Sequence, residues 1–385
     1  MTMPFQTATE QAVHTARAVH SGAPLPTEVE PPTLRVEGLR RDYVQPTDFI
    51  DRVGRALRRQ GTPPPVQAVA GIDLEIHHGE VLAVVGESGC GKTTLGRMLT
   101  GIIPPTAGRV LYRGRDVATL QGAQRREYEL AVQMIFQDPY SSLNPRMRVR
   151  DIIGEAPLVH GLVNRAERDE YVRGLLEKVG LDPGYRERYP HQFSGGQRQR
   201  IGVARALALK PAVLVCDEAV AALDVSIQAQ VLNLFMDLRR DFDLTYVFIS
   251  HNLGVVSHIS DRVAIMYLGR VVELAPTARV FAAATHPYTQ ALLKELPVLS
   301  AGRRRFDPIV GELPSPADPP TGCAFHPRCP YAMPRCRNER PLLRQVGEGH
   351  WSACHLNETG DTPSGMAIAG EASAPAPAPQ VSLST

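Results

Sequence analysis

The clearest features of the hydrophobic pattern are two short, unbroken apolar runs. Residues 81–85 (VLAVV) and 212–216 (AVLVC) have the length of strands, and uninterrupted apolar strands are typical of a parallel sheet that is covered on both faces. Further strand-like runs alternate with helical patterns up to about residue 290, which predicts an α/β fold. Between the two runs, residues 148–200 are charged and mostly helical in pattern, so we expect an inserted helical subdomain.

The composition changes at both ends of this pattern. Residues 1–31 are rich in Ala, Thr, Glu and Pro, and residues 357–385 contain the string APAPAP; we expect both segments to be disordered. The rest of the chain divides into an α/β domain at 32–295, whose helical subdomain occupies about 138–200, and a Cys-rich extension at 296–356. We find no internal repeat, so the pattern predicts a single α/β unit.

Charge and hydropathy argue against several classes of protein. Lys and Arg number 42 and Asp and Glu number 40, so the chain lacks the basic excess of a nucleic-acid binder. No stretch reaches the roughly 18 uninterrupted apolar residues of a membrane span. The N-terminal residues have neither the basic start nor the apolar run of a secretory signal. We therefore expect a cytoplasmic chain whose membrane role, if it has one, comes through a partner.

A phosphate-binding loop is indicated directly after the first apolar run. The string GESGCGKT at 86–93 has the spacing GxxxxGK[ST] and opens a helical pattern, which is the strand–loop–helix context of a P-loop. Its glycines let successive backbone N–H groups point at phosphate oxygens, and the helix N-terminus adds partial positive charge. We expect Lys92 to reach the β- and γ-phosphates and Thr93 to supply a hydroxyl to Mg²⁺. Cys90 is interpreted as a small apolar filler.

Two adjacent acids follow the second apolar run. Asp217 closes this strand pattern and Glu218 comes next. An acid at the end of an apolar strand is a usual ligand for hydrated Mg²⁺ opposite a P-loop. We therefore expect Asp217 to bind the metal through water and Glu218 to act as the general base for the attacking water.

A third motif separates this chain from other P-loop ATPases. The string FSGGQ at 193–197 is followed by the helical stretch RQRIGVARALAL. Here the sequence resembles the ABC ATPase family, whose signature motif is LSGGQ, with Phe193 in place of its first residue. Ser194 can cap the following helix, and the two glycines expose N–H groups at its positive end. In that family ATP lies between the P-loop of one subunit and the signature motif of another, and the resemblance implies the same here.

Other matches to the family occur in the family's order along the chain. Gln137, in MIFQDPYSSLNPR, matches the glutamine that senses Mg²⁺ and γ-phosphate, and residues 221–224 (AALD) match the D-loop. His251 follows the strand-like run LTYVFIS and matches the switch histidine that contacts γ-phosphate. Tyr43 is predicted to stack on adenine, with simple packing as the alternative.

The chain departs from the family at two of these positions. Ala221 stands where Ser is usual, and Asn252 stands where Asp is usual. The change at Ala221 removes a hydroxyl that would face the ATP of the partner subunit, which puts communication between subunits in doubt. The predicted hydrolytic residues are not affected by it.

Together these motifs define the expected site. The resemblance implies that the catalytic residues are Glu218, His251 and Gln137, and that the Mg²⁺ ligands are Thr93, Gln137 and Asp217. The ATP-binding residues are expected to be Tyr43, Gly86, Ser88, Gly89, Cys90, Gly91, Lys92, Thr93, Thr94, Gln137, Ser194, Gly195, Gly196, Gln197, Asp217 and Asp224.

Longer strings narrow the resemblance to one group within the family. VVGESGCGKTT, MIFQDPYSSLNPRMRVRDII, DEAVAALDVSIQAQVLNL and THPYTQALL are similar to the ATP-binding subunits of oligopeptide and dipeptide importers, over about residues 32–356. The resemblance implies a second, homologous ATPase subunit, two membrane permease subunits and an external substrate-binding protein, with this chain on the cytoplasmic face of the membrane. Closely similar chains serve nickel or glutathione import, so these substrates stay open.

Four cysteines are concentrated near the C-terminus. Cys323, Cys329, Cys336 and Cys354 lie within 32 residues, and four soft thiolates suit a tetrahedral Zn²⁺ or a [4Fe–4S] cluster. Their spacing fits neither the paired CxxC zinc ribbon nor the compact ferredoxin run. The resemblance favours an iron–sulfur cluster, with zinc or unligated packing cysteines as the alternatives.

Two further interpretations remain open from the sequence. Residues 49–59 show apolar side chains on one helical face with arginines around them, which is typical either of a helix on an anionic membrane or of an insertion packed on the core. A soluble ABC ATPase acting on RNA or DNA is a rival function. Such proteins usually carry two ATPase units or a long coiled-coil insertion, and this sequence has neither pattern.

Overall fold

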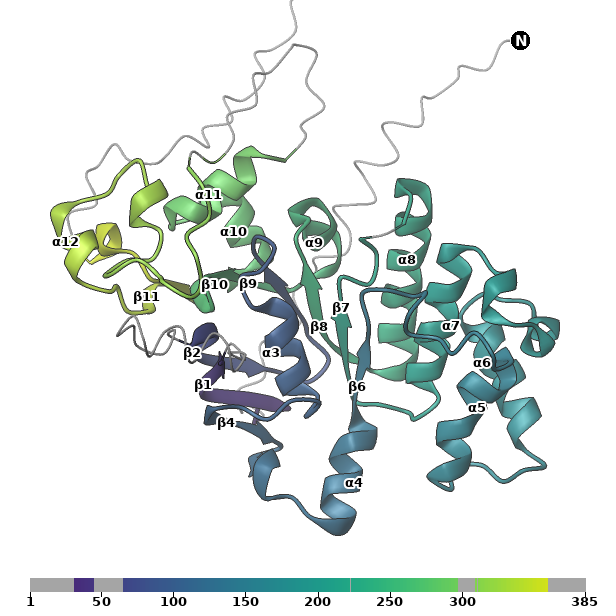
Figure 1. The fold of residues 1–385 in the computed structure, drawn as a ribbon. Helices are drawn as coiled ribbons and strands as arrows, with labels where there is room; N and C mark the ends of the chain where they lie inside the picture. The colour runs from purple at the N-terminus through teal and green to yellow at the C-terminus, as the bar shows by residue number, and fades with distance from the viewer. Residues whose placement is uncertain (1–30, 45–64, 222, 297–308, 310, 359–385) are drawn as a thin grey trace, which may run out of the picture. The chain divides into compact units, whose positions relative to one another are not determined.

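The computed structural model describes residues 31–44, 65–221, 223–296, 309 and 311–358. These residues build an eight-stranded sheet with the strand order β11-β12-β10-β9-β3-β8-β7-β6 (Figure 1). Its strands are β3 (Val81–Val85), β6 (Val132–Ile135), β7 (Val213–Asp217), β8 (Thr245–Ser250), β9 (Arg262–Tyr267), β10 (Arg270–Pro276), β11 (Arg344–Gly347) and β12 (His350–Ser352).

The centre of this sheet is parallel and fully buried. β9, β3, β8, β7 and β6 pair in parallel, and every residue of β3, β7 and β8 is buried. Strands covered on both faces need apolar side chains at every position, which explains their unbroken sequence pattern. The strand predicted at 81–85 is confirmed, and the one predicted at 212–216 is displaced by one residue so that it includes Asp217.

The expected parallel sheet is confirmed only for these central strands. β9, β10, β12 and β11 pair antiparallel. A second, four-stranded sheet in the order β2-β1-β4-β5 is antiparallel throughout, and the alternation of strand and helix patterns did not indicate it. Its strands are β1 (Leu34–Tyr43), β2 (Val66–Ile76), β4 (Ala107–Tyr112) and β5 (Arg115–Asp116).

Helix α3 (Lys92–Leu99) packs between the two sheets (Figure 1). Its buried residues Leu95, Met98 and Leu99 share one hydrophobic core with side chains of both sheets. The helix lies close to the strands, because a Cβ on Gly96 would meet the Cδ1 of Ile249 at 2.8 Å. The other helices are α4 (Gly122–Ala131), α5 (Val149–Val159), α6 (Arg168–Lys178), α7 (Gly195–Leu207), α8 (Val225–Phe242), α9 (Leu253–Ile259), α10 (Thr277–Ala283), α11 (Pro287–Lys294) and α12 (Pro334–Asn338).

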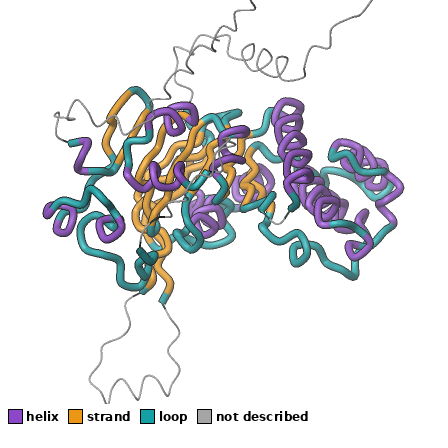
Figure 2. The backbone as a smooth tube through the Cα atoms, turned by 90° about the horizontal axis from the view of Figure 1, so that it is seen from above, coloured by secondary structure: helices purple, strands orange, loops and turns teal. Residues whose placement is uncertain are grey.

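Helices α5, α6 and α7 pack against one another at the β6 end of the sheet, and both views show them grouped there (Figures 1 and 2). They share a second core with the inner face of α8 and with side chains of β7 and β8. The helical pattern predicted for 148–200 agrees with these helices, although α7 continues to Leu207.

Residues 311–358 are joined to the main sheet by strand pairing and by a buried polar pair. β12 pairs with β10, which places Ser352 opposite Glu273. The Glu273 carboxylate is fully buried and lies 2.7 Å from the Nε2 of His350. Burial alone raises the pKa of Glu273, but hydrogen bonds from His350 and the Thr285 backbone outweigh it and hold this pKa below its ordinary value. Residues 311–358 are therefore joined to the sheet by the pair of Glu273 and His350 as well as by backbone hydrogen bonds.

Several expectations fall on parts of the chain that the structure does not describe. The helical face at 49–59 lies outside the described residues, as do nearly all of the two segments expected to be disordered. Within the described residues, no helix has both the length and the apolar character that crossing a membrane requires.

Candidate functional site

The loop between β3 and α3 is packed so closely that two of its positions admit only glycine. A Cβ on Gly91 would lie 2.0 Å from the carbonyl oxygen of Ala68, and one on Gly86 would lie 2.2 Å from that of Met266. Gly91 also has a φ of +105°, which side chains rarely adopt. No side chain caps the first turn of α3. Its N–H groups therefore remain available to an anion, as the P-loop prediction requires.

Lys92 is held inside this loop. Its side chain is buried, with the Nζ donating to the carbonyl oxygens of Gly86 at 2.7 Å and Glu87 at 2.9 Å. Its third partner is the Cys90 Sγ at 4.0 Å. A buried ammonium group whose partners are all uncharged has its charge uncompensated, so an incoming phosphate would be stabilised here.

A hydrogen-bonded pair of a hydroxyl and a carboxylate lies at the start of α3. The Thr93 hydroxyl donates to the Asp217 carboxylate across 2.9 Å. Asp217 is 2% exposed, and its burial raises its pKa; the Thr93 hydrogen bond opposes this shift and the nearby Glu218 adds to it. A hydroxyl and a buried carboxylate are hard oxygen ligands whose charge a divalent cation would compensate, so the pair fits Mg²⁺.

The three residues predicted to be catalytic contact one another at Glu218, the residue after Asp217. Glu218 accepts a hydrogen bond from the Nε2 of Gln137 at 2.8 Å, and its other oxygen lies 3.4 Å from the Nδ1 of His251. Gln137 follows β6, Glu218 follows β7 and His251 follows β8. Glu218 has a φ of +45°, a strained backbone conformation for a residue with a side chain. The N–H of Glu218 donates to the Ile249 carbonyl at 3.0 Å, which helps to hold it there.

The signature motif forms a capped helix start. Ser194 is the N-cap of α7 and its hydroxyl accepts from the Gln197 N–H, while the Gln197 side chain accepts from the Ser194 N–H. This reciprocal capping box confirms the predicted cap. Around Gly195, a Cβ would meet no atom closer than 3.8 Å. In Figure 1, α7 and α3 are separated by the strands β7 and β8, so the chain does not bring its signature motif to its own phosphate loop.

The other predicted loop residues are nearby but differ in exposure. Ser88 and Gly89 are exposed, and Thr94 lies half-buried in the first turn of α3. Cys90 is 1% exposed and belongs to the core, where burial raises the pKa of its thiol. Its role as an apolar filler is confirmed.

Tyr43 ends β1 at the side of the site. It pairs with Val66 of β2, two residues before Ala68, which contacts Gly91. The ring is 38% exposed and the Arg41 guanidinium lies 5.0 Å from its centroid. The ring is thus accessible at the border of the loop, and adenine stacking stays a prediction.

The remaining matches lie at helix starts. Asp224 is the exposed N-cap of α8, without a side-chain capping bond. Asn252, where the family usually has Asp, caps α9 by accepting from the N–H groups of Gly254 and Val255. This substitution therefore keeps the capping function. Ala221 is exposed, and its N–H donates to the Glu218 carbonyl.

Two residues that touch the phosphate loop were not predicted. Tyr288 and Arg328 both bond to Glu87. They are 201 and 241 residues away from it in sequence. Tyr288 lies within the string THPYTQALL, but that match gave no sign of a contact with the phosphate loop, and no motif marks Arg328.

The four C-terminal cysteines lie near one another. All are reduced thiols. Burial, with a smaller contribution from the neighbouring thiols, raises the pKa of Cys329 to about 11 and that of Cys354 to about 12. Within the described residues, however, no three His, Cys, Asp or Glu side chains are grouped as ligands of one metal ion. The donor set is thus chemically suited to a soft metal centre, but its sulfurs are not gathered as ready-made ligands.

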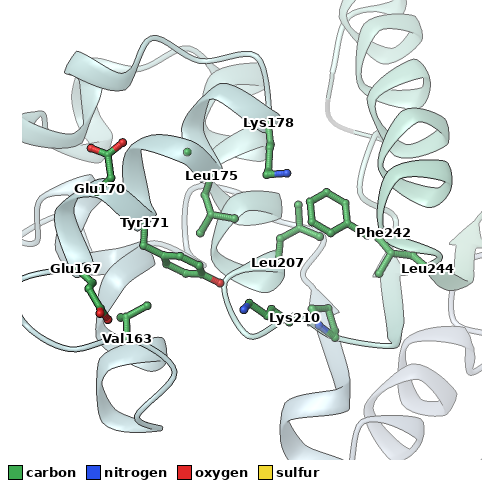
Figure 3. Close-up of a pocket in the computed structure, with 12 residues that line it drawn as sticks. Val163, Glu167, Glu170, Tyr171, Leu175, Lys178, Leu207, Lys210, Phe242 and Leu244 are labelled. Atoms are coloured by element: carbon green, nitrogen blue, oxygen red, sulfur yellow. The ribbon is translucent and has the colours of Figure 1, made fainter.

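A pocket of about 730 Å³ lies at the opposite edge of the sheet from the phosphate loop. Figure 3 shows Tyr171 and Leu175 of α6 facing Phe242 and Leu244 across Leu207. It lies where α6 and the ends of α7 and α8 meet the amino ends of β7 and β8. The lining is mostly apolar, with Glu167, Glu170, Lys178 and Lys210 among its residues, and it has no glycine-rich loop to bind phosphates, so this is not the nucleotide site.

Comparison with known families agrees with the motifs. Residues 69–221 match the ABC transporter family, and residues 272–336 match the C-terminal region of oligopeptide/dipeptide transporters. The chain is 50% identical to an oligopeptide transport ATP-binding protein of Bacillus subtilis, over 80% of this chain and 94% of that protein. It is 52% identical to a di/tripeptide transport ATP-binding protein of Pseudomonas aeruginosa, over 76% of this chain and 91% of that protein.

Solved structures agree on the fold. A subunit of an ABC transporter complex from Clostridium perfringens has a TM-score of 0.54 at 27% identity, over 66% of this chain and 92% of that one. An ATP-binding cassette solved with ADP and Pi also has a TM-score of 0.54, at 22% identity, over 63% of this chain and 98% of that one. The second likeness shows the fold alone.

Proposed function

Because this chain belongs to the family of ATP-binding subunits of peptide ABC transporters, we propose that it hydrolyses ATP to power the import of oligopeptides or dipeptides. One observation carries the chemical part of the proposal. Glu218 lies between Gln137 and His251 and next to Asp217, which bonds to Thr93 of the phosphate loop. A carboxylate held this way can accept a proton from water close to a bound γ-phosphate.

The roles of the individual residues follow from their surroundings. Lys92 and the open first turn of α3 bind the phosphates. Thr93 and Asp217 would hold Mg²⁺, which neutralises phosphate charge. Glu218 takes the proton of the attacking water, Gln137 orients its carboxylate, and His251 contacts the γ-phosphate.

The general-base role gives a first prediction. Glu218→Gln should keep ATP binding but lower kcat in the assembled transporter at least about 100-fold, because the amide cannot accept the proton of water. ATP binding to the isolated chain and phosphate release from the transporter measure the two effects. The exposed Glu348 gives the matched control, since Glu348→Gln removes an equal charge far from the site. Wild-type turnover in Glu218→Gln would remove this residue from the base role.

We propose that the signature motif acts on the ATP of a second, homologous ATPase subunit. Ser194 caps α7, and the space around Gly195 in its first turn is open, whereas Gly196 packs against Ile227; the N–H groups of such a helix start can bind an anion. Because α7 is separated from α3, a phosphate bound at the start of α7 would have to belong to the ATP of another chain. The pairing of two different ATPase subunits follows the importer resemblance.

This arrangement gives a second prediction. Gly195→Asp should be tolerated by the fold, because a side chain there meets no close neighbour and an acid favours a helix start. The new carboxylate should repel the phosphate of the partner and reduce hydrolysis by the assembled transporter more than about 10-fold. The isolated chain should bind ATP as tightly as the wild type; an equal loss of affinity in the isolated chain would contradict action in trans.

The membrane partner has a candidate binding place in the apolar pocket of Figure 3. We propose that a permease subunit inserts apolar side chains between α6 and the ends of β7 and β8, which would hold the chain at the cytoplasmic face of the membrane. The pocket lies between the helices α5–α7 and the sheet, so a segment seated there would move when ATP changes their arrangement. It lies away from the phosphate loop, and both ligands can therefore bind at once.

A third prediction fills this pocket without disturbing the fold. Gly174 lines it, and a Cβ at this position would meet no atom within 4 Å. Gly174→Trp should abolish co-purification with the permease subunits while ATP binding by the isolated chain is unchanged. Gly174→Ala, which leaves most of the pocket open, is the control and should assemble normally. Normal assembly of Gly174→Trp would place the permease elsewhere.

We propose that the extension at 296–356 binds a [4Fe–4S] cluster through Cys323, Cys329, Cys336 and Cys354, with zinc as the alternative. The support is four neighbouring thiols in a segment with few apolar residues, whose order a metal centre would increase. Binding would have to draw the four sulfurs together. It would also remove protons from thiols whose pKa values are raised, so affinity should increase with pH.

The fourth prediction is spectroscopic. Anaerobically purified protein should absorb broadly near 400 nm and contain about four irons per chain. Cys354→Ser should bleach this absorbance and speed proteolysis of the extension without weakening ATP binding. Stoichiometric zinc without iron would make the site a structural zinc site, and four freely titratable thiols in the native protein would exclude both metals.

A further inference from the structure

The second residue of the phosphate loop is held by the C-terminal part of the chain. The N–H of Glu87 donates to the hydroxyl oxygen of Tyr288 in α11 at 2.9 Å. Its carboxylate accepts two hydrogen bonds from the Nη1 of Arg328, at 2.9 and 3.1 Å. Glu87 is therefore fixed through both its backbone and its side chain by groups that come from far along the sequence.

This contact is shielded from water. The side chain of Arg328 is 6% exposed and that of Glu87 is 23% exposed. An ion pair at this depth is weakly screened, and removing one partner leaves a charge in a poorly solvated place. It thus differs from the exposed ion pair between Arg335 and Glu339, whose side chains are 47% and 59% exposed.

An aromatic cluster fixes the two groups that hold Glu87. The Phe325 ring is 2% exposed and contacts Tyr267 and Tyr288, with ring centroids 5.3 and 5.4 Å away. The hydroxyl of Tyr267 lies 3.5 Å from the Nη1 of Arg328. Because Phe325 and Arg328 belong to the C-terminal segment, this segment forms part of the support beneath the loop.

The same residue is also connected to the phosphate-binding lysine. The carbonyl of Glu87 accepts from the Nζ of Lys92 at 2.9 Å. A shift of Glu87 would therefore move both the loop backbone and the carbonyl that orients the ammonium group.

We propose that Arg328 and Tyr288 are positioning residues of the ATP site: through Glu87 they hold the phosphate loop in the shape that receives the β- and γ-phosphates. The C-terminal segment thereby sets the affinity of the chain for ATP. This inference rests on the proposed ATPase function. Neither residue touches the reacting atoms, so the effect falls on nucleotide binding and not on the hydrolytic step.

The test separates binding from turnover. In Arg328→Ala, the Kd for ATP of the isolated full-length chain and the KM of the assembled transporter should both rise at least about 10-fold, with kcat at saturating ATP changed less than about 2-fold. Arg328→Lys keeps the charge but replaces the planar guanidinium by an ammonium group on a more flexible side chain, and should recover part of the affinity. Tyr288→Phe keeps the ring packing and removes only the hydroxyl, so about a 3-fold rise in Kd is expected.

A double variant, a control variant and the melting temperature distinguish a positioning role from a general loss of stability. Once Glu87→Gln has removed the ion pair, Arg328→Ala should add little further change in Kd. Arg335→Ala breaks ion pairs to Glu339 and Glu358 within the C-terminal segment, and should leave the Kd unchanged. If Arg328→Ala and Tyr288→Phe lower the melting temperature but leave Kd and KM at wild-type values, or if Arg335→Ala raises Kd equally, the inference is wrong. A wild-type transporter without ATPase activity would instead contradict the proposed function.

Discussion

The parallel ladder that joins β6, β7, β8 and β3 is the constraint on which the candidate site depends. Parallel pairing brings the carboxyl ends of these strands to one edge of the sheet. Gln137, Glu218 and His251 reach one another only because the strands that precede them are neighbours in this order. The phosphate loop leaves the same edge from β3. A change of strand order would separate these groups even if every motif were kept.

The charged groups at this edge of the sheet suit a nucleotide with its cation. Without that ligand, their burial lowers the stability of the fold. Asp217 is buried with a raised pKa, and the partners of Lys92 are two carbonyls and the Cys90 thiol, all uncharged. Glu218 has a strained φ, a conformation that costs about 1–3 kcal/mol. A nucleotide with its cation would compensate the first two charges. The strain is sustained by rigid surroundings, since β7 and β8 are buried along their whole length.

Features that are set by adjacent residues could be predicted from the sequence. Contacts between segments far apart in the chain could not. The strand at 81–85, the loop that follows it and the Ser194 cap are set by adjacent residues, and all were predicted. The pairing of β12 with β10 and the bonds of Arg328 to Glu87 join segments far apart in the chain. Periodicity describes which face of a strand is buried, but it carries no information about which distant segment covers that face.

The two anion-binding helix starts also bear on how the subunit can be controlled. The start of α3 has Lys92 beside it, in the same loop. The start of α7 has open space at Gly195, and the strands β7 and β8 lie between the two helices (Figure 1). In the proposed arrangement, a single chain would offer one half-site for its own ATP and one for that of a neighbour. Hydrolysis would therefore require assembly, while affinity could be adjusted within the chain through Glu87. Assembly would control hydrolysis, and Glu87 would control ATP binding. Because these are different steps, ATP could bind before the two subunits close around it and hydrolysis begins.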